Sequence, residues 1–365
     1  MEAVILVGGK GTRLLPLTCN TPKPMVPVLN KPFMDYVIQH LAEHGVRDVI
    51  MAMGHLPQSI KNHFGDGTNF NCHIAYALEN TPMDTAGAVK NAERYLSKKA
   101  FLVLNGDIFT DLDFTDMVRF HREKKAKVTI ALTPVEDPTA YGLIETDSRG
   151  RITRFLEKPR PDQITTNMIN AGTYVLEPEV LDDIPRDTRF SFERKLFPML
   201  LERGEPVYAY ASDAYWMDIG TPERYLQIHR DLLAGKSKLH TVAAGSSLNI
   251  GEGCRIHKTA KITGSVVIGR NSAVGANVTI KGPAVIGEEC VVGEDSTIEE
   301  SVIWQKSRIG AGAMLKKSFV ADNCTIAQGS TIEETIMGDH VSVGCDLALG
   351  AGSKIWPGTV AEAPK

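Results

Sequence analysis

The sequence predicts an α/β fold, in which a Rossmann-like, mainly parallel sheet is followed by a left-handed parallel β-helix. Over residues 1–235 short apolar runs alternate with helical patterns, which is typical of parallel strands joined by helical crossovers. From residue 250 onward an aliphatic residue recurs at every sixth position. Neither an α-helix, with a period of about 3.6, nor a simple strand produces that spacing. We therefore expect one domain over residues 1–235, a linker over 236–248 and the β-helix over 249–365.

The first domain has a regular order of expected elements. Strands are expected at residues 2–7, 48–53, 73–78, 101–105, 151–156 and 173–176, and helices at 35–44, 57–64 and about 85–95. Such alternation implies helices on both faces of the sheet, with ligands bound beyond the carboxyl ends of the strands. Functional residues are therefore expected in the strand-to-helix loops.

The repeats of the second domain are specific in their spacing. Aliphatic residues follow one another at intervals of six from Ile250 to Ile298, and the interval then shortens by one at Ile303, Val320 and Met337. Three hexads make one coil of a triangular prism, in which each coil buries its neighbour. Small residues lie four positions after the aliphatic ones and are expected to pack inside the prism. This group includes Cys254, Cys290 and Cys324, for which we favour packing over reactivity.

Composition excludes several classes of function. The net charge is −4 with mixed signs, which argues against nucleic acid or an anionic membrane as a partner. No apolar stretch approaches the roughly 18 residues of a membrane span, and the first residues lack the pattern of a secretory signal, so we expect a cytoplasmic protein. The six cysteines form no CxxC pair, so neither a zinc site nor a disulfide framework is expected.

A glycine-rich segment follows the first expected strand. Residues 8–13 read Gly-Gly-Lys-Gly-Thr-Arg, and Lys23 stands between two prolines. Backbone amides of such a turn can bind phosphate, Arg13 can neutralise a departing pyrophosphate, and Lys23 can place a charge on the attacked phosphate. The spacing fits neither a Walker A loop nor a dinucleotide fingerprint. A tight turn with solvated cations remains the alternative.

Two carboxylates occupy positions suited to Mg²⁺. Asp107 follows the apolar strand at 101–105, and Asp218 lies in the stretch Trp-Met-Asp-Ile-Gly-Thr-Pro. Mg²⁺ takes one or two carboxylates and completes its shell with phosphate oxygens and water. The alternatives are a turn or helix cap for Asp107, and an incidental position before the N-cap Thr221 for Asp218.

A third group has the chemistry of a sugar phosphate site. Glu157 and Lys158 follow the strand at 151–156, and Asn170 opens the strand expected at 173–176. A lysine can bind the phosphate while a glutamate accepts hydrogen bonds from sugar hydroxyls. An exposed ion pair is the alternative.

Together these motifs resemble the sugar-1-phosphate nucleotidylyltransferases, also called nucleotide-sugar pyrophosphorylases. The resemblance spans the chain in order, β-helix included, and rests on residues 8–13, Pro22-Lys23-Pro24, Gly106-Asp107, Tyr141-Gly142, Glu157-Lys158-Pro159, Asn170-Ala171-Gly172 and Trp216-x-Asp218-Ile219-Gly220. It implies in-line attack by the sugar phosphate on the α-phosphorus of a nucleoside triphosphate, without a covalent enzyme intermediate.

The resemblance also implies a role for each site residue. Asp107 and Asp218 would hold Mg²⁺, and the catalytic cations would be Arg13, Lys23 and Lys158. The nucleotide would be bound by Leu6, Val7, Gly8, Gly9, Gly11, Thr12, Arg13, Lys23, Asp84, Thr85, Gly87, Asn105 and Asp107. The sugar phosphate would be bound by Gly142, Glu157, Lys158 and Asn170.

Within the family the chain looks most like the mannose-1-phosphate guanylyltransferases, so GTP and mannose 1-phosphate, giving GDP-mannose, are the expected substrates. UTP or dTTP with glucose 1-phosphate is the alternative. Many relatives have Leu-Gly where this chain has Met83-Asp84, and the added carboxylate would suit donor groups such as guanine N1 and N2 or a ribose hydroxyl.

Two functions of other classes stay open. The chain could be a catalytically silent regulatory subunit, or a bifunctional enzyme whose β-helix is an acyltransferase. Arg13, Lys23, Asp107, Lys158 and Asp218 are all present, which argues against the first. No long insertion interrupts the hexads, which argues against the second. We interpret the β-helix as a scaffold for assembly or regulation and expect a homo-oligomer.

Overall fold

The computed structural model describes residues 1–239 and 248–362, and the chain forms two compact units. The first unit comprises Met1–Gly9 and Met34–Asp218, and the second comprises Lys10–Phe33 and the chain from Ile219 onward. Residues 10–33 thus cluster with the β-helix, although the sequence division assigns them to the first domain. Residues 240–247 of the expected linker and residues 363–365 lie outside the described residues.

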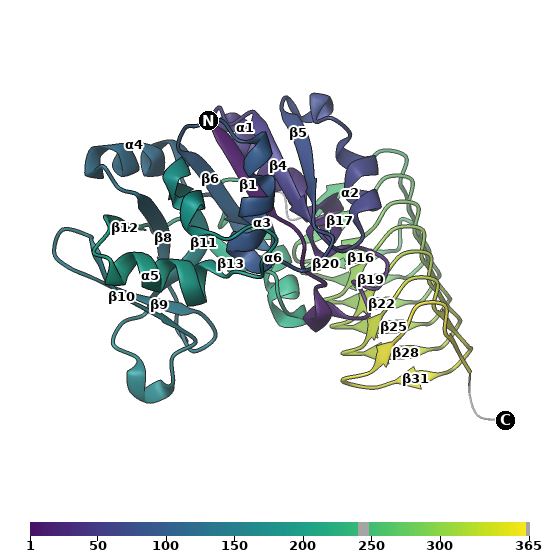
Figure 1. The fold of residues 1–365 in the computed structure, drawn as a ribbon. Coiled ribbons are helices and arrows are strands. Elements are labelled where there is room, and N and C mark those ends of the chain that lie inside the picture. The colour runs from purple at the N-terminus through teal and green to yellow at the C-terminus, as the bar shows by residue number, and fades with distance from the viewer. Residues whose placement is uncertain (240–247, 363–365) are drawn as a thin grey trace. The chain divides into compact units, whose positions relative to one another are not determined.

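A mixed sheet forms the centre of the first unit (Figure 1). Its strand order is β10-β9-β11-β6-β1-β4-β5, and β8 pairs with β11 and β12. The four strands β6, β1, β4 and β5 are parallel, whereas β11 runs antiparallel to β6. The strands are β1 (Glu2–Leu6), β4 (Asp48–Met53), β5 (His73–Leu78), β6 (Phe101–Asn105), β8 (Val128–Pro134), β9 (Gly142–Thr146), β10 (Ile152–Glu157), β11 (Met168–Leu176) and β12 (Val207–Ala211). This arrangement confirms the predicted α/β class.

Helices pack on this sheet, with α3 against β1 and β4 and α4 against β8 and β12. The helices are α1 (Phe33–Glu43), α2 (Pro57–Phe64), α3 (Asp84–Ala92), α4 (Phe114–Lys124), α5 (Phe197–Glu202) and, in the second unit, α6 (Pro222–Leu233). Local capping explains where some begin: the Asp113 side chain accepts the Asp116 N–H at the start of α4. None of the helices in the described part of the chain has the length and hydropathy of a membrane span.

The expected elements differ from the observed ones mainly at their ends. The strands at 48–53, 73–78 and 101–105 and the helix at 57–64 have the expected bounds. The helix expected at 85–95 ends as α3 at Ala92, and a 3₁₀ turn, η4 (Glu93–Tyr95), follows. The strand expected to begin at Thr173 begins at Met168, so Asn170 lies inside β11 rather than before it. The pairing of β11 with β8 resumes across a β-bulge, and a propensity pattern does not predict that.

Stacked coils form the C-terminal part of the second unit (Figure 1). Every described strand pair in it is parallel, and the strands form three sheets. The first contains β14 (Leu248–Ile250), β17 (Val266–Ile268), β20 (Ala284–Ile286), β23 (Val302–Ile303), β26 (Phe319–Val320), β29 (Ile336–Met337) and β32 (Lys354–Ile355). The second contains β15 (Arg255–Ile256), β18 (Ala273–Val274), β21 (Val291–Val292), β24 (Arg308–Ile309), β27 (Thr325–Ile326), β30 (Ser342–Val343) and β33 (Val360–Ala361). The third contains β16 (Lys261–Thr263), β19 (Thr279–Lys281), β22 (Thr297–Glu299), β25 (Met314–Lys316), β28 (Thr331–Glu333) and β31 (Ala348–Leu349). The predicted β-helix is therefore confirmed.

The shortened repeats correspond to tight corners of the coil. Glu300, Lys317 and Glu334 adopt left-handed backbone conformations, with φ of 46°, 46° and 45°. The next residue at each corner is a serine or threonine, and all three of these are fully buried. Losing one residue at a corner keeps the strands in register, so the stack of aliphatic side chains continues without a break.

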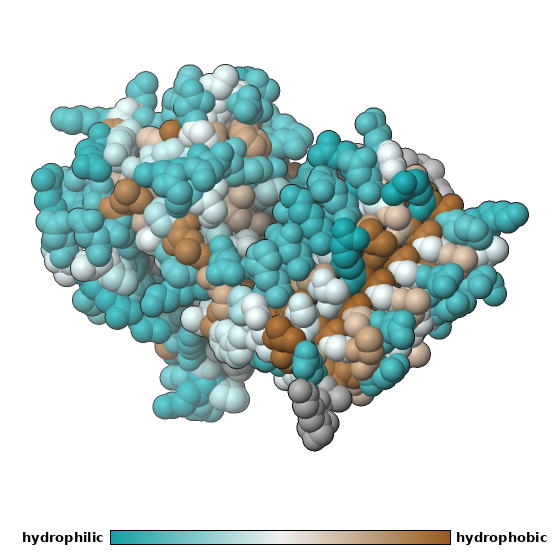
Figure 2. All heavy atoms as spheres, turned by 90° about the vertical axis from the view of Figure 1, so that its right-hand side faces the viewer, coloured by the Kyte–Doolittle hydropathy of each residue, from teal (hydrophilic) through white to brown (hydrophobic). Residues whose placement is uncertain are grey.

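Inward positions hold small and aliphatic residues, as the spacing predicts. Cys290 and Cys324 are buried, and burial raises the pKa of their thiols to about 11 and about 12. A thiol with such a pKa stays protonated and behaves as a small apolar group. Figure 2 shows the outer result of the stacking: brown apolar residues run in rows between teal polar ones on the side built from the repeats.

The stacking predicts that an isoleucine inside the stack contributes more to the stability of the fold than an isoleucine in its first strand. Ile298 is fully buried, whereas Ile250, in the first strand of the stack, is 44% exposed. We expect Ile298→Ala to lower the free energy of unfolding by about 2–5 kcal/mol and Ile250→Ala by less than about 1 kcal/mol. Urea unfolding followed through the buried Trp304 measures both. Equal losses would contradict the assignment of Ile298 to the prism interior.

Candidate active site

The carboxyl ends of the parallel strands lie along one edge of the sheet in the first unit. Leu6, the last residue of β1, pairs with Ala52 of β4 on one side and with Asn105 of β6 on the other. The Gly106 N–H donates to Leu6 O at 2.9 Å. The chain after β1 and the chain after β6 therefore leave the sheet side by side, where parallel sheets bind ligands.

Asp107 and Asp218 come together through a short two-stranded sheet. β7 (Ile108–Thr110) pairs antiparallel with β13 (Trp216–Asp218), and Asp218 lies opposite Ile108. Asp107 is the residue before Ile108, so the backbones of the two acidic residues lie close together at this end of the ladder. Asp218 is 6% exposed, which places one of the two charges in a largely desolvated position.

A bulge in β11 connects this pair to the sheet. The register of β11 with β8 shifts between Asn170 and Tyr174, and Gly172 has a φ of 70°. A Cβ on Gly172 would lie 2.7 Å from the Asn105 side-chain nitrogen, so only glycine suits both the backbone conformation and the close approach. The indole N–H of Trp216 donates to Ala171 O at 2.9 Å, which ties β13 to the bulge.

Asn170, Gly142 and Glu157 form a row across three strands. Ile169 of β11 pairs with Leu143 of β9, and the antiparallel register then sets Asn170 opposite Gly142. Gly142 in turn pairs with Glu157 of β10. The pairing of three successive strands thus aligns these three predicted sugar-site residues.

Glu157 sits in a partly desolvated, acidic environment. Burial raises the pKa of its carboxyl, the nearby Glu193 charge raises it further, and Lys158 opposes both. Lys158 is exposed and has a φ of 51°, and its N–H donates to Tyr141 O at 2.9 Å. The chain therefore turns sharply at Lys158, directly after the strand that carries Glu157.

Glu193 joins the row to the start of α3 through hydrogen bonds. Its Oε2 accepts from Thr85 Oγ1 at 2.9 Å and from Ser191 Oγ at 2.7 Å, and its Oε1 accepts from the Tyr174 hydroxyl at 3.3 Å. The Asn170 side-chain amide donates to the same Tyr174 hydroxyl at 2.9 Å. Three elements, α3, β11 and the turn that carries Glu193, thereby share one polar network.

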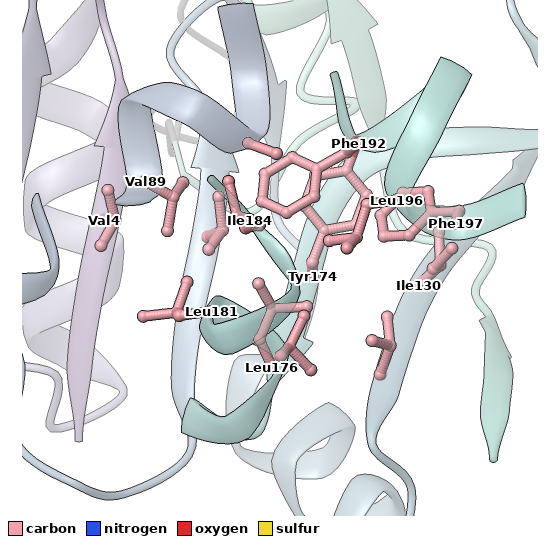
Figure 3. Packing of buried hydrophobic residues seen from close by; sticks show 14 of the residues in the cluster. Val4, Val89, Ile130, Tyr174, Leu176, Leu181, Ile184, Phe192, Leu196 and Phe197 are labelled. Atoms are coloured by element: carbon pink, nitrogen blue, oxygen red, sulfur yellow. The ribbon is translucent and has the colours of Figure 1, made fainter. Parts of the chain in front are cut away.

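An aromatic cluster packs against the turn that carries Glu193. Glu193 lies in a π-helical turn, η7 (Phe192–Leu196), which runs into α5. The ring centroid of Tyr174 is 5.4 Å from that of Phe192 and 5.3 Å from that of Phe197. Figure 3 shows Tyr174, Phe192, Leu196 and Phe197 packed together. Because these side chains are fully buried, the turn that carries Glu193 is held on the sheet by apolar packing.

Asp84, the polar residue that begins α3, contacts nearby residues of the same unit. Asp84 has a φ of 62°; its Oδ1 accepts the Thr85 N–H at 3.0 Å and its Oδ2 is 3.4 Å from Arg189 Nε. Gly87 is buried, and a Cβ there would lie 2.6 Å from Thr188 O. Gly87 therefore permits close packing of α3.

Glu79 is a carboxylate that the sequence analysis did not single out. It directly follows β5, and its Oε2 accepts the Met83 N–H at 2.9 Å. A Cβ on Gly8 would lie 2.9 Å from its Oε1, so the carboxylate lies against the glycine-rich segment. Burial raises the pKa of this carboxyl.

Four predicted nucleotide-site residues belong to the second unit: Gly11, Thr12, Arg13 and Lys23. Arg13 is exposed in a 3₁₀ turn, η1 (Thr12–Leu14), whereas Lys23 is 8% exposed. A Cβ on Gly11 would lie 3.1 Å from Lys23 Cβ. These residues form a second group, next to each other in their own unit.

The remaining predicted residues belong to the first unit: Leu6, Val7, Gly8, Gly9, Asp84, Thr85, Gly87, Asn105, Asp107, Gly142, Glu157, Lys158, Asn170 and Asp218. Glu79, Tyr174 and Glu193, which lie close to some of them, were not predicted from the sequence. Glu79 had a usable signal, since it follows a parallel strand directly. Glu193 had none, because only the fold brings its turn to Thr85.

The donor set near Asp107 fits Mg²⁺. The described residues contain no group of three or more His, Cys, Asp or Glu side chains that could hold a metal. Two carboxylates are nonetheless what a protein contributes to Mg²⁺ when phosphates and water complete its shell. Asn105 Oδ1 is also buried, and it accepts no hydrogen bond from the described residues.

Comparison with known families decides the classification. The model of the family described as nucleotidyl transferase matches residues 2–235, and that of the GMPPB C-terminal domain matches residues 262–358. The chain belongs to the nucleotidyl transferase family. It is an enzyme of nucleotide-sugar synthesis, and its family substrates are a nucleoside triphosphate and a sugar phosphate. The resemblance inferred from the motifs is thereby confirmed.

Individual relatives differ in the substrates that they are named for. This chain is 37% identical to mannose-1-phosphate guanylyltransferase of Mycobacterium tuberculosis, and the match covers 74% of this chain and 76% of that protein. It is 36% identical to UTP–glucose-1-phosphate uridylyltransferase of a Synechocystis species, and that match covers 88% of this chain and 87% of that protein. Among solved structures, HddC from Yersinia pseudotuberculosis complexed with GMP-PN matches with a TM-score of 0.55 at 32% identity, over 62% of this chain and 97% of that one.

The close approach at Gly142 predicts a selective defect. A Cβ there would lie 2.7 Å from Phe155 Cζ and 3.0 Å from Glu157 Oε2, so Gly142→Ala must displace the Phe155 ring and crowds the Glu157 carboxylate. We expect the KM for the sugar 1-phosphate to rise about tenfold, equivalent to about 1.4 kcal/mol, with the KM for the nucleoside triphosphate within about twofold of wild type.

Gly350→Ala is the matched control, because its Cβ would meet nothing within 4 Å. Steady-state kinetics of both folded variants make the comparison. An unchanged sugar KM in Gly142→Ala would contradict the assignment of the Asn170–Gly142–Glu157 row to the sugar.

Proposed function

We propose that this nucleotidyl transferase couples GTP to mannose 1-phosphate at the edge of its first-unit sheet, giving GDP-mannose and pyrophosphate. One observation carries the proposal. The Asn170–Gly142–Glu157 row crosses β11, β9 and β10 of the large sheet, and Asp107 follows β6 of the same sheet, with Asp218 brought to it by the β7–β13 ladder. This arrangement supports a metal–phosphate site and a sugar site in the same unit.

The proposed reaction needs no protein nucleophile. An oxygen of the sugar phosphate attacks the α-phosphorus in line; the new P–O bond forms as the bond to the β-phosphate oxygen breaks, and pyrophosphate leaves with the bonding electrons. The attacking oxygen is already anionic, so no proton needs to be removed. The protein's tasks are positioning and charge neutralisation.

Cations of the chain would supply that neutralisation. Lys158, exposed on its turn after β10, would bind the phosphate of the sugar. Arg13 and Lys23 would bind the triphosphate, together with amides of the glycine-rich segment from Gly8 to Thr12. Asp107 and Asp218 would hold Mg²⁺, which supplies further neutralisation of phosphate charge when bound.

The sugar would be oriented by acceptors on the three-strand row. Glu157 would accept hydrogen bonds from sugar hydroxyls, and the Asn170 amide would contact the ring from the neighbouring strand. Glu193 would act as a positioning residue, since it fixes Tyr174 and Thr85 on either side.

Guanine is favoured as the base by two carboxylates near the glycine-rich segment. Guanine presents donors at N1 and N2, and carboxylates accept such pairs of hydrogen bonds. Glu79 lies against Gly8, and Asp84 begins the helix that follows. The names of the Mycobacterium relative and of the GMP-PN complex support the same choice. Leu6, Val7, Gly9 and Thr85 would complete this pocket.

UTP with glucose 1-phosphate is the second candidate. The Synechocystis relative, named for that pair, matches 88% of the chain, whereas the guanylyltransferase of Mycobacterium matches 74%. Thymidine triphosphate belongs to the same alternative. We further propose a cytoplasmic homo-oligomer. The names of the relatives, which are enzymes of nucleotide-sugar synthesis, support the location, and the repeat scaffold supports assembly.

A substrate matrix tests the proposal. The triphosphates of A, C, G, U and T are each combined with the 1-phosphates of glucose, mannose, galactose and N-acetylglucosamine, and pyrophosphate release is measured. We expect the highest kcat/KM with GTP and mannose 1-phosphate. A maximum with UTP or dTTP and glucose 1-phosphate would replace that assignment, and no release with any pair would favour the silent subunit.

The metal assignment predicts a large and specific loss. We expect Asp107→Asn to lower turnover about 100-fold or more, because a neutral amide is a much weaker Mg²⁺ ligand. Asp182→Asn, at an exposed position in the same unit, is the charge-matched control. Near-normal turnover of a folded Asp107→Asn protein would exclude this residue as a metal ligand.

A further inference from the structure

Residues 10–33, which we call the phosphate loop, cluster with α6 and the β-helix in the second unit. The loop carries Arg13 and Lys23. Hydrogen bonds tie it to the rest of its unit on both sides of Lys23. The coils of the β-helix that make these bonds are far away in sequence, so the contacts are a property of the fold.

The first anchor precedes Lys23 and uses a buried carboxylate. The Asn20 side-chain amide donates to Asp339 Oδ2 at 3.0 Å, and the Asp322 N–H donates to Asp339 Oδ1 at 3.2 Å. Asp339 is 6% exposed. One oxygen therefore holds the neighbouring coil and the other holds the phosphate loop.

Burial and the negative charge of Asp339 raise the pKa of two groups near this anchor, Cys19 and Asp322. Burial raises the pKa of the Cys19 thiol, and the Asp339 charge adds to the effect. Burial raises the pKa of Asp322 to about 6, again with a contribution from Asp339. An additional negative charge at position 20 would thus face a carboxylate in a poorly solvated place.

The second anchor follows Lys23 and is a hairpin. β2 (Pro27–Val28) and β3 (Lys31–Pro32) are joined through Leu29 and Asn30, which have φ of 47° and 67°. The Asn30 side chain donates to Ile286 O of β20 at 2.8 Å, and the Leu29 N–H donates to His229 Nδ1 of α6 at 3.4 Å. The turn is fastened to a coil and to α6.

A buried tyrosine completes the second anchor. The Tyr225 hydroxyl of α6 donates to Pro27 O at 2.5 Å and accepts from the Trp304 indole N–H at 3.0 Å. Its ring centroid lies 5.3 Å from that of Phe319. The loop, α6 and two successive coils are thereby joined in one chain of contacts.

Lys23 lies between the anchors and is largely buried. Thr18 Oγ1 donates to Gly11 O at 2.9 Å, which folds the start of the loop toward Lys23. A buried lysine on a restrained backbone has few ways to move its ammonium group. Its position is therefore set by what holds the loop.

We propose that the β-helix is a positioning element for the phosphate loop, and that Asn20 and Asp339 are positioning residues for binding of the nucleoside triphosphate. The inference rests on the proposed function, in which Arg13 and Lys23 bind the triphosphate. It gives the repeats a task in the reaction beyond assembly, since a shift of the coils that carry Ile286 or Asp339 would move the loop.

An exchange of the two side-chain types tests the pair directly. Asn20→Asp replaces the donor amide with a carboxylate, which would lie next to the carboxylate of Asp339. In Asn20→Asp with Asp339→Asn, the new amide can donate to residue 20 while its oxygen still accepts the Asp322 N–H. We expect Asn20→Asp to raise the KM for GTP about fivefold or more, the sugar KM to stay within about twofold, and the double variant to return to within about twofold of wild type.

Two further readouts separate positioning from general stability. Amide hydrogen exchange should accelerate in peptides from residues 10–33 of Asn20→Asp, but not in repeat peptides, and should recover in the double variant. Asn277→Asp is the matched control, since the Asn277 amide donates to Asp295 at 3.1 Å within the repeats. It should change neither the loop exchange nor the KM for GTP.

Each outcome decides the inference. Normal loop exchange in Asn20→Asp, altered exchange with an unchanged KM for GTP, or failure of the double variant to recover would each overturn it. Equilibrium titration with a non-hydrolysable GTP analogue is run alongside the kinetics. If the wild type released no pyrophosphate with any substrate pair, the proposed reaction would be wrong. The titration with the GTP analogue and the amide hydrogen exchange would still show whether the two anchors position the loop for nucleotide binding.

Discussion

The pairing of β13 with β7 is the interaction on which the first-unit site depends. It places Asp218 opposite Ile108 and therefore beside Asp107, while the Trp216 indole fixes β13 to the bulge of β11. The pairing thereby brings two acidic residues from distant segments of the chain to the same end of a short ladder. That is the backbone arrangement that the proposed Mg²⁺ site requires, since Mg²⁺ takes one or two carboxylates from the protein.

The remaining groups are arranged by two different kinds of scaffold. Antiparallel registers align Asn170, Gly142 and Glu157 across three strands, and a packed aromatic cluster supports the turn that carries Glu193. The phosphate loop, in contrast, is held within the second unit by contacts with α6 and the coils. A solenoid is well suited to such support, because each coil is fixed by its neighbours and transmits little local motion.

Prediction from the sequence succeeded where the spacing of aliphatic residues determines the structure, and it failed where contacts between distant segments determine it. Spacing alone gave the β-helix and the tight corners at Glu300, Lys317 and Glu334. It failed at β11, where Asn170 lies inside a bulged strand, because local propensity does not register the pairing with β8. Glu193 was missed for a similar reason: its hydrogen bonds to Thr85 and Tyr174 exist only once a π-helical turn packs on the sheet. Glu79 was within reach, since it directly follows a parallel strand.

The central claim is that Asp107 and Asp218 hold one shared divalent cation. Electron paramagnetic resonance of Mn²⁺, titrated into the protein with a non-hydrolysable GTP analogue, tests it without turnover. We predict one tight Mn²⁺ site per chain, weakened about tenfold or more by Asp107→Asn or by Asp218→Asn, with little further loss when both are changed because they serve the same ion. Unaltered Mn²⁺ binding in Asp218→Asn would contradict the account.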